Sequence, residues 1–152
     1  MIRSLSALLI VLSVHVAGAS ASAAQGQDVL YVNGSLTGGA GDGSSWADAF
    51  RGPGALSSAL DTATSGDEVW VAEGTYFPSG VGDRSAYFPV RAGVHVYGGF
   101  LGSELSLGDR SPAWTHPSVL SGDYARDDEL SGGSMAENCR QVLRTEGATW
   151  DA

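Results

Sequence analysis

Short runs of β-branched and aromatic residues, separated by polar turns, recur along the chain. Val69, Trp70 and Val71 form the clearest run, which lies between a polar turn at Gly66 and a second turn at Gly74. Runs of this kind, bounded by glycine, are typical of short β-strands. A strand of this length needs neighbours in a sheet, so the placement of the other strands decides the fold.

A helical pattern comes just before this strand. Leu56, Ala59, Leu60 and Ala63 recur at helical spacing and predict an amphipathic helix over residues 55–63. A helix this short is marginal on its own, so its apolar stripe should cover another apolar surface.

Further apolar runs begin at Val94, Val119 and Val142. Counted from Val69, the first valines are separated by 25, 25 and 23 residues. One main strand per period predicts a β-solenoid, in which each strand lies over the previous one at about 4.8 Å. The helix over residues 55–63 would then cap the first coil, whose backbone groups are otherwise unpaired.

The alternation of side chains along each strand predicts which of them face the core. The predicted inward set is Val69, Val71, Val94, Val96 and Val119, and the predicted outward set is Trp70, His95 and Leu120. The rival fold is a small antiparallel sandwich, which would place strands every 8–12 residues. The longer period favours the solenoid.

The first residues have the pattern of a secretory signal peptide. Arg3 provides a positive charge, Leu5 to Val16 are mostly apolar, and small residues follow. We assign residues 1–24 to this signal, with cleavage within 19–25, and expect an exported protein with no membrane span after cleavage. Residues 25–65 would then hold a strand, a glycine-rich loop and the helix. Residues 66–152 would hold the first coils, apparently truncated, with an open last coil that could self-associate.

Composition and charge narrow the function. The formal net charge is −9, and all eight basic residues are arginine. An acidic chain without lysine is poorly suited to binding nucleic acid or an anionic membrane. Cys139 is the only cysteine, so no internal disulfide can form. It could pair between chains, react as a free thiol, or be a small loop residue, and the last reading is favoured.

Several blocks of sequence, in a fixed order, resemble the N-terminal region of secreted bacterial right-handed parallel β-helix proteins, which have the pectin-lyase-like fold. The resemblance implies a capped stack of coils in an exported, surface or extracellular protein. It implies no single activity, because the family includes polysaccharide lyases, hydrolases and adhesin-like proteins. The matching blocks are Tyr31–Asn33, Gly41–Trp46, Leu56 with Ala59–Leu60, Gly66–Tyr76, Asp83–Ser85, Val96–Phe100, Gly102–Glu104 and Leu120–Asp123.

Catalytic candidates are few. The resemblance implies that a lyase would hold Ca²⁺ with acidic residues and abstract a proton with an arginine or lysine. Asp123, Asp127 and Arg126 supply those residue types, but a charge run in a connecting loop is more often simply solvated. His95 and His116 have no other ligand at metal-binding spacing. We therefore predict no catalytic residues and no cofactor, with Ca²⁺ expected only in the lyase alternative.

Aromatic side chains are the remaining candidates for binding. Trp70 and Tyr97 could form a platform on which a sugar ring stacks, although packing is the favoured reading for such residues. The sequence thus predicts a structural or adhesive segment, with polysaccharide or cell-surface components as its partners. The alternatives are a polysaccharide-binding or polysaccharide-processing protein whose active coils are missing, and a gene fragment without function.

Overall fold

Strands outnumber helices among the regular elements of the described part of the chain. The computed structural model describes residues 27–78, 83–112, 114–127 and 135–147, so the expected signal peptide (1–24) lies outside the described residues. The predicted all-β class is confirmed. The elements in order are β1 (Val29–Val32), α1 (Ala55–Thr62), β2 (Glu68–Ala72), β3 (Gly74–Tyr76), β4 (Phe88–Arg91), β5 (His95–Phe100), the 3-10 helix η1 (Leu107–Asp109), β6 (Ser118–Leu120) and β7 (Leu143–Glu146).

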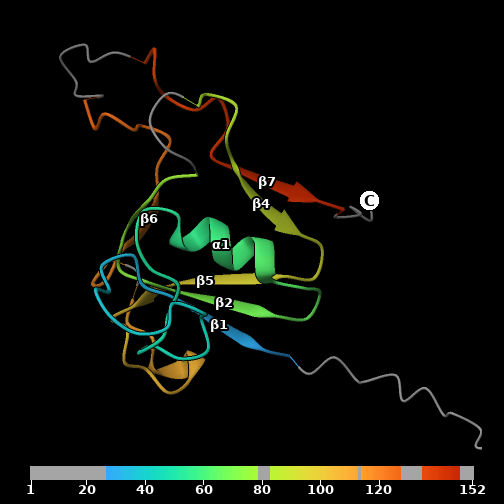
Figure 1. Ribbon diagram of the computed structural model, residues 1–152, viewed down its shortest axis with the longest axis vertical. Coiled ribbons are helices and arrows are strands. Elements are labelled where there is room, and N and C mark those ends of the chain that lie inside the picture. The colour runs from blue at the N-terminus through green and yellow to red at the C-terminus, as the bar shows by residue number, and fades with distance from the viewer. Residues whose placement is uncertain (1–26, 79–82, 113, 128–134, 148–152) are drawn as a thin grey trace, which may run out of the picture.

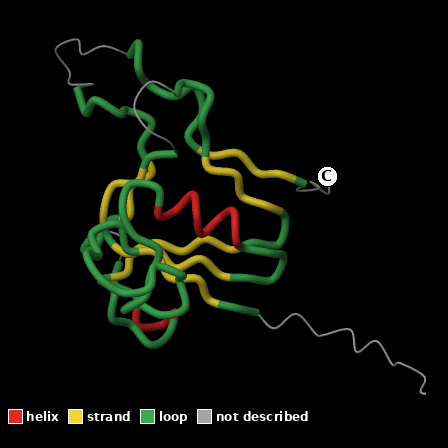
Figure 2. The backbone as a smooth tube through the Cα atoms, viewed as in Figure 1, coloured by secondary structure: helices red, strands yellow, loops and turns green. Residues whose placement is uncertain are grey.

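The strands form three short sheets, with the orders β1-β2-β5, β3-β6 and β4-β7. Every pairing among the described strands is parallel, which excludes the antiparallel sandwich. In Figure 2 the paired strands, in yellow, run alongside one another. The chain passes through the three sheets in one order with β2, β3 and β4, and repeats that order with β5, β6 and β7.

The register differs from the predicted alignment of valines. Val69 pairs with Val96, 27 positions later, and not with Val94. Val119 lies opposite Thr75 in a different sheet, so it does not stack over either of those strands. The prediction of a constant period is wrong because the loops between strands differ in length, and loops absorb such differences at little cost.

The new register also reverses the predicted faces of β6. Val119 is 45% exposed, whereas Leu120 packs against the core. Side chains alternate along a strand, so a shift of one residue exchanges the inward and outward sets. In β2 the predicted inward residues, Val69 and Val71, are both buried, and His95 at the start of β5 is exposed as predicted.

Helix α1 closes one end of the apolar core. The predicted stripe is buried, and it packs in one cluster with residues of β1, β2 and β4. Figure 1 shows the helix between the β1-β2-β5 sheet and β4, and it contacts both. Arg91 of β4 donates from Nη1 to the carbonyl oxygens of Leu60 (2.7 Å), Asp61 (3.1 Å) and Ala63 (3.2 Å). A cation at this end satisfies the last carbonyl groups of a helix.

The turn before β2 is held by the Asp67 side chain, which is buried (7% exposed). Its carboxylate accepts hydrogen bonds from the backbone N–H of Thr64 (2.8 Å), the hydroxyl of Thr64 (2.9 Å) and the backbone N–H of Asp28 (3.2 Å). The bond from the Thr64 N–H lowers the pKa of Asp67 most. The other two bonds add to that effect, and together they outweigh burial, which raises the pKa.

We expect Asp67→Asn to lower the free energy of unfolding near neutral pH by about 1–3 kcal/mol, because an amide leaves a buried donor unpaired. The folded-state pKa of Asp67 lies below its ordinary value of 3.8. Its contribution is therefore complete above that value and is lost as the pH falls through the folded-state pKa. Urea unfolding of both proteins across the acid range measures this. Their difference should shrink below about pH 4. Asp61→Asn, on the exposed face of α1, is the control; an equal effect there would contradict the assignment.

Candidate binding cleft beside strand β3

Trp70, predicted as half of a sugar platform, is buried in an aromatic layer outside the β1-β2-β5 sheet. Its side chain is 5% exposed. Its ring stacks on Phe100 (centroids 4.9 Å apart, planes at 12°) and meets the edge of Tyr31 (5.7 Å). The indole N–H donates to Glu68 Oε2 (2.7 Å). Trp70 thus has no open ring face for a sugar, which agrees with the favoured packing interpretation and not with the platform.

Tyr97, the other predicted platform residue, lies opposite Trp70 in the β2-β5 pairing and is half-buried. Its ring is nearly parallel to that of His95 (6.3 Å, 11°). The guanidinium of Arg110 lies 5.5 Å from the ring centroid, within the range of a cation–π contact. Tyr97 is thus a neighbour of Trp70 but is less buried, and a role for Tyr97 in binding a glycan stays a prediction.

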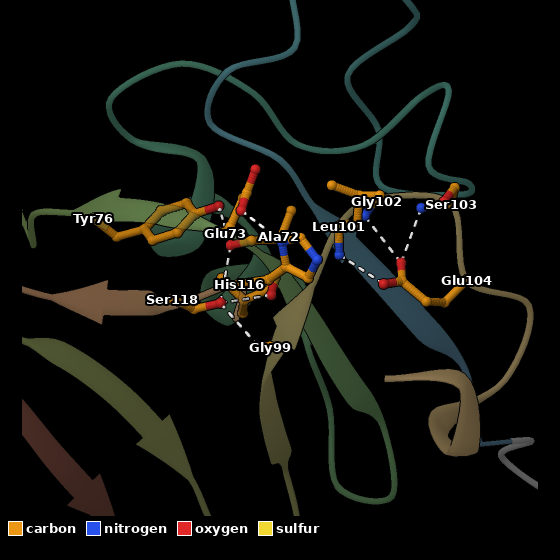
Figure 3. A network of polar contacts seen from close by, with 11 residues as sticks. Ala72, Glu73, Tyr76, Gly99, Leu101, Gly102, Ser103, Glu104, His116 and Ser118 are labelled. Atoms are coloured by element: carbon orange, nitrogen blue, oxygen red, sulfur yellow. Dashed lines mark hydrogen bonds and ion pairs between the residues drawn. The ribbon is translucent and has the colours of Figure 1, made fainter. Parts of the chain in front are cut away.

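The corner between the β1-β2-β5 and β3-β6 sheets is held by a polar network (Figure 3). The hydroxyl of Ser118 donates to the carbonyl oxygens of Val71 (2.9 Å) and Ala72 (3.0 Å). It accepts from the N–H of Gly99 (3.1 Å). The hydroxyl of Tyr76 also donates to the carbonyl of Ala72 (3.0 Å). One serine thus links β2, β5 and β6 where the chain turns.

Glu104 belongs to the same region and explains one of the matching blocks. Its carboxylate accepts from the backbone N–H groups of Leu101 (2.6 Å), Gly102 (2.9 Å) and Ser103 (2.9 Å). Burial raises the pKa of Glu104, but these donors outweigh it and hold the pKa below its ordinary value. The Gly102–Glu104 block is therefore a turn in which the backbone N–H groups are hydrogen-bonded to the side chain of Glu104.

A contact between a histidine and a carboxylate lies on the outer side of this corner. His116 Nδ1 is 2.8 Å from Glu73 Oε2, and Figure 3 shows the two side chains meeting. Glu73 is the single residue between β2 and β3, while His116 comes two residues before β6. The pair thus bridges two strand ends that are far apart in sequence. Apart from the residue types, no local pattern in the sequence marks this contact.

A cleft of about 340 Å³ lies beside β3. Glu73, Thr75 and Phe77 line one side of it, and the turns at Gly34 and Gly52 line another, with Arg126 also at its wall. A second hollow of about the same volume continues along β3 towards Val119, and it shares Glu73 and Thr75 with the first. The two hollows thus adjoin at β3.

The acidic residues of the lyase alternative also come together. Asp123 and Asp127 join Glu137, which the sequence analysis missed, and one ligand atom of each lies within 4.8 Å of the others. Two oxygens on one Ca²⁺ at 2.3–2.6 Å can be about that far apart. Glu137 Oε1 is buried and has no hydrogen-bond partner among the described residues. Carboxylate oxygens are ligands that Ca²⁺ prefers, so the three residues fit this ion, which would offset two of their three negative charges.

The proposed base of that alternative is placed differently. The guanidinium of Arg126 lies over the ring of Phe77, 5.2 Å from its centroid, at the β3 cleft. The structure thus assigns Asp123 and Asp127 to an acidic cluster and Arg126 to the cleft wall. Cys139, the single cysteine, is half-buried, and its backbone N–H donates to the carbonyl of Gly122 (2.9 Å).

Comparison with known proteins gives no match to a family model, to a curated protein or to a solved structure. The arrangement of the residues is therefore the basis for any functional proposal. Within the described ranges, no helix combines the length and apolar character that crossing a membrane requires.

Proposed function

We propose that this chain is the helix-capped N-terminal unit of an exported right-handed parallel β-helix, with a structural or adhesive role at the cell surface or outside the cell. The observation that carries the proposal is the strand order. The chain visits the three parallel sheets twice in the same order, and each strand of the second round adds to the outer edge of a strand of the first. Repetition of that order is what successive coils of a solenoid produce. Right-handed crossovers are the rule for parallel strands.

The two ends of this stack differ, which supports a capping role. At one end α1 covers the apolar interior with Leu56 and Leu60. At the other end β5, β6 and β7 each have one strand partner among the described strands, as β1, β3 and β4 do, so the helix is what distinguishes the two ends. Such edges accept a further coil, or a second copy of the chain, by backbone pairing. The unit would therefore start a stack and present its open side for extension or self-association.

A cysteine crosslink tests the coil arrangement. In a Cys139→Ser background, Thr75→Cys with Val119→Cys places two thiols directly opposite in β3 and β6. Parallel neighbours lie about 4.8 Å apart, within the Cα distances that a disulfide spans. We expect rapid oxidation to a disulfide, detected as a mobility shift. The control pair, His95→Cys with Val119→Cys, joins strands of different sheets and should not crosslink. Equal crosslinking of both pairs would overturn the proposed coil.

The role itself is tested on cells of the native host. We expect the processed protein in the culture medium or accessible to added protease on intact cells, and no release of unsaturated sugars from pectic polymers with Ca²⁺. Retention in the cytoplasm would contradict export.

The second candidate function is a polysaccharide-binding or lyase-like activity, and the cluster of Asp123, Asp127 and Glu137 is the observation that favours it. Ca²⁺-dependent release of unsaturated sugars that is lost in Asp127→Asn would replace the structural proposal with this one.

A further inference from the structure

One edge of β3 is open to the cleft. The N–H of Gly74 donates to the carbonyl of Pro117 (3.0 Å), and the carbonyl of Tyr76 accepts from the N–H of Ser121 (2.9 Å), so both residues bond towards β6. Alternate residues of a strand direct their backbone groups to opposite edges, so the N–H and C=O of Thr75 point away from β6. Among the described strands, β3 has β6 as its one partner.

The cleft lies along that open edge. Its wall includes Thr75 itself, and the turns at Gly34 and Gly52 face β3 across it. Thr75 is exposed. A ligand in the cleft therefore meets the N–H of Thr75 as a donor and its C=O as an acceptor, spaced as in any β-strand edge. That pattern suits an extended peptide, which can add to a sheet as a further strand.

Arg126 supplies the charge at this cleft. It has φ 56°, the one positive φ of a non-glycine residue in the described chain. Holding a side-chain-bearing residue there costs free energy, and such strain is characteristic of ligand clamps. The guanidinium rests over Phe77, and Phe77 in turn packs against Tyr124 (5.7 Å, 30°). This stacking positions the guanidinium over the cleft wall.

Among the described residues, nothing occupies the N–H donors of Arg126. Within the described residues, its guanidinium makes neither a hydrogen bond nor an ion pair. A planar guanidinium matches a carboxylate with two parallel N–H···O bonds. Glu73 at the same cleft disfavours a ligand of high negative charge, so one carboxylate is favoured over a phosphate.

We propose that this cleft binds an extended peptide with a carboxylate at one end: the peptide backbone pairs with Thr75 and the carboxylate with Arg126. The proposal stands apart from the structural role above, because it depends on the β3 edge and on one arginine.

The probe for the test is the acetylated tripeptide Val-Thr-Val with a free C-terminal carboxylate, compared with its C-terminal amide. Titration into the mature protein, followed by amide NMR, should shift the Thr75 signal with the free acid. The amide should bind roughly 10- to 100-fold more weakly, because a charge-assisted bidentate bond is lost. No shift at Thr75 with either peptide at millimolar concentration overturns the proposal.

Substitutions then test the role of Arg126. We expect Arg126→Gln to weaken binding of the free acid roughly 10- to 100-fold and to leave binding of the amide unchanged. Arg126→Lys keeps the charge but loses the planar pair of N–H donors. Its affinity for the free acid should lie between those of the wild type and Arg126→Gln. The matched control is Arg144→Gln, since Arg144 is another exposed arginine over an aromatic ring, Tyr87 (5.3 Å).

Two results would contradict the assignment. One is an equal loss of binding in Arg144→Gln. The other is tight binding of a galacturonate trisaccharide at Thr75 and Arg126 while the peptide acid does not bind, which would make the ligand a glycan. Thermal unfolding of each variant shows that it is folded. Arg126→Asn, which relieves the strained backbone more readily, provides a second folded variant without the guanidinium.

Discussion

Replacing Trp70 by alanine should lower the free energy of unfolding by about 3–5 kcal/mol, the usual cost of removing a buried tryptophan from a core. The reason is its place in the aromatic layer. Its side chain is 5% exposed, stacks on Phe100 and contacts Tyr31, so its removal leaves a cavity in that layer. Its hydrogen bond to Glu68 is lost as well. Urea unfolding of the mature protein, followed by circular dichroism, measures the change.

Trp114→Ala is the matched control for that experiment. Trp114 is 85% exposed, and surface substitutions of this kind usually change stability by less than about 0.5 kcal/mol. The same two variants separate packing from sugar binding. Unchanged stability in Trp70→Ala, with loss of retention on a polysaccharide column, would restore the predicted platform and contradict the packing assignment.

The second large effect is expected at the helix that closes the core. Leu60→Ala should destabilise the protein by about 2–5 kcal/mol, the range for buried leucine in well-packed cores. Leu60 is 2% exposed and lies in the cluster that joins α1 to Val69 and Phe88. Because α1 is short and makes no hydrogen bond from a side chain at its N-cap, its stability comes mainly from this packing. Hydrogen exchange should therefore show faster opening of α1.

Leu105→Ala is the control for the same chemical change. Leu105 is 92% exposed, so its truncation removes little buried surface. A loss of stability in Leu60→Ala no larger than in Leu105→Ala would mean that α1 does not close the core. The proposed capping role would then fail with it.

These predictions connect the candidate site to the fold. Trp70 and Leu60 lie on either side of the β1-β2-β5 sheet, one in the outer aromatic layer and one in the core. Neither contributes to the cleft beside β3, whose wall includes Glu73, Thr75 and Arg126. Loss of stability and loss of peptide binding should therefore be separable in this molecule.

Part of the fold could be predicted from local patterns. The stripe of Leu56 and Leu60 predicted α1 to within one residue of its end, because helical periodicity depends on neighbours three and four positions apart. The alternation of Val69 and Val71 likewise predicted which face of β2 packs in the apolar core. Both signals are contained in a few consecutive residues.

The candidate site could not be predicted in the same way. Arg126 is 49 positions after Phe77 in the chain, and only folding brings the two into contact. Glu137 joins Asp123 and Asp127 from beyond an intervening segment, so no local spacing marks it as a ligand. The lyase alternative grouped Arg126 with the neighbouring acids, whereas the fold separates their roles.

The sequence by itself determined the all-β class of the described chain, the helix α1 and the strand β2, since these depend on propensity and on short-range alternation. Only the tertiary structure decided the partner of each strand. Val69 pairs with Val96, and Val119 lies opposite Thr75, because parallel pairing is set by contacts between distant segments and by loops of unequal length. That choice of partners buries Trp70, exposes Val119 and leaves one edge of β3 open beside Arg126.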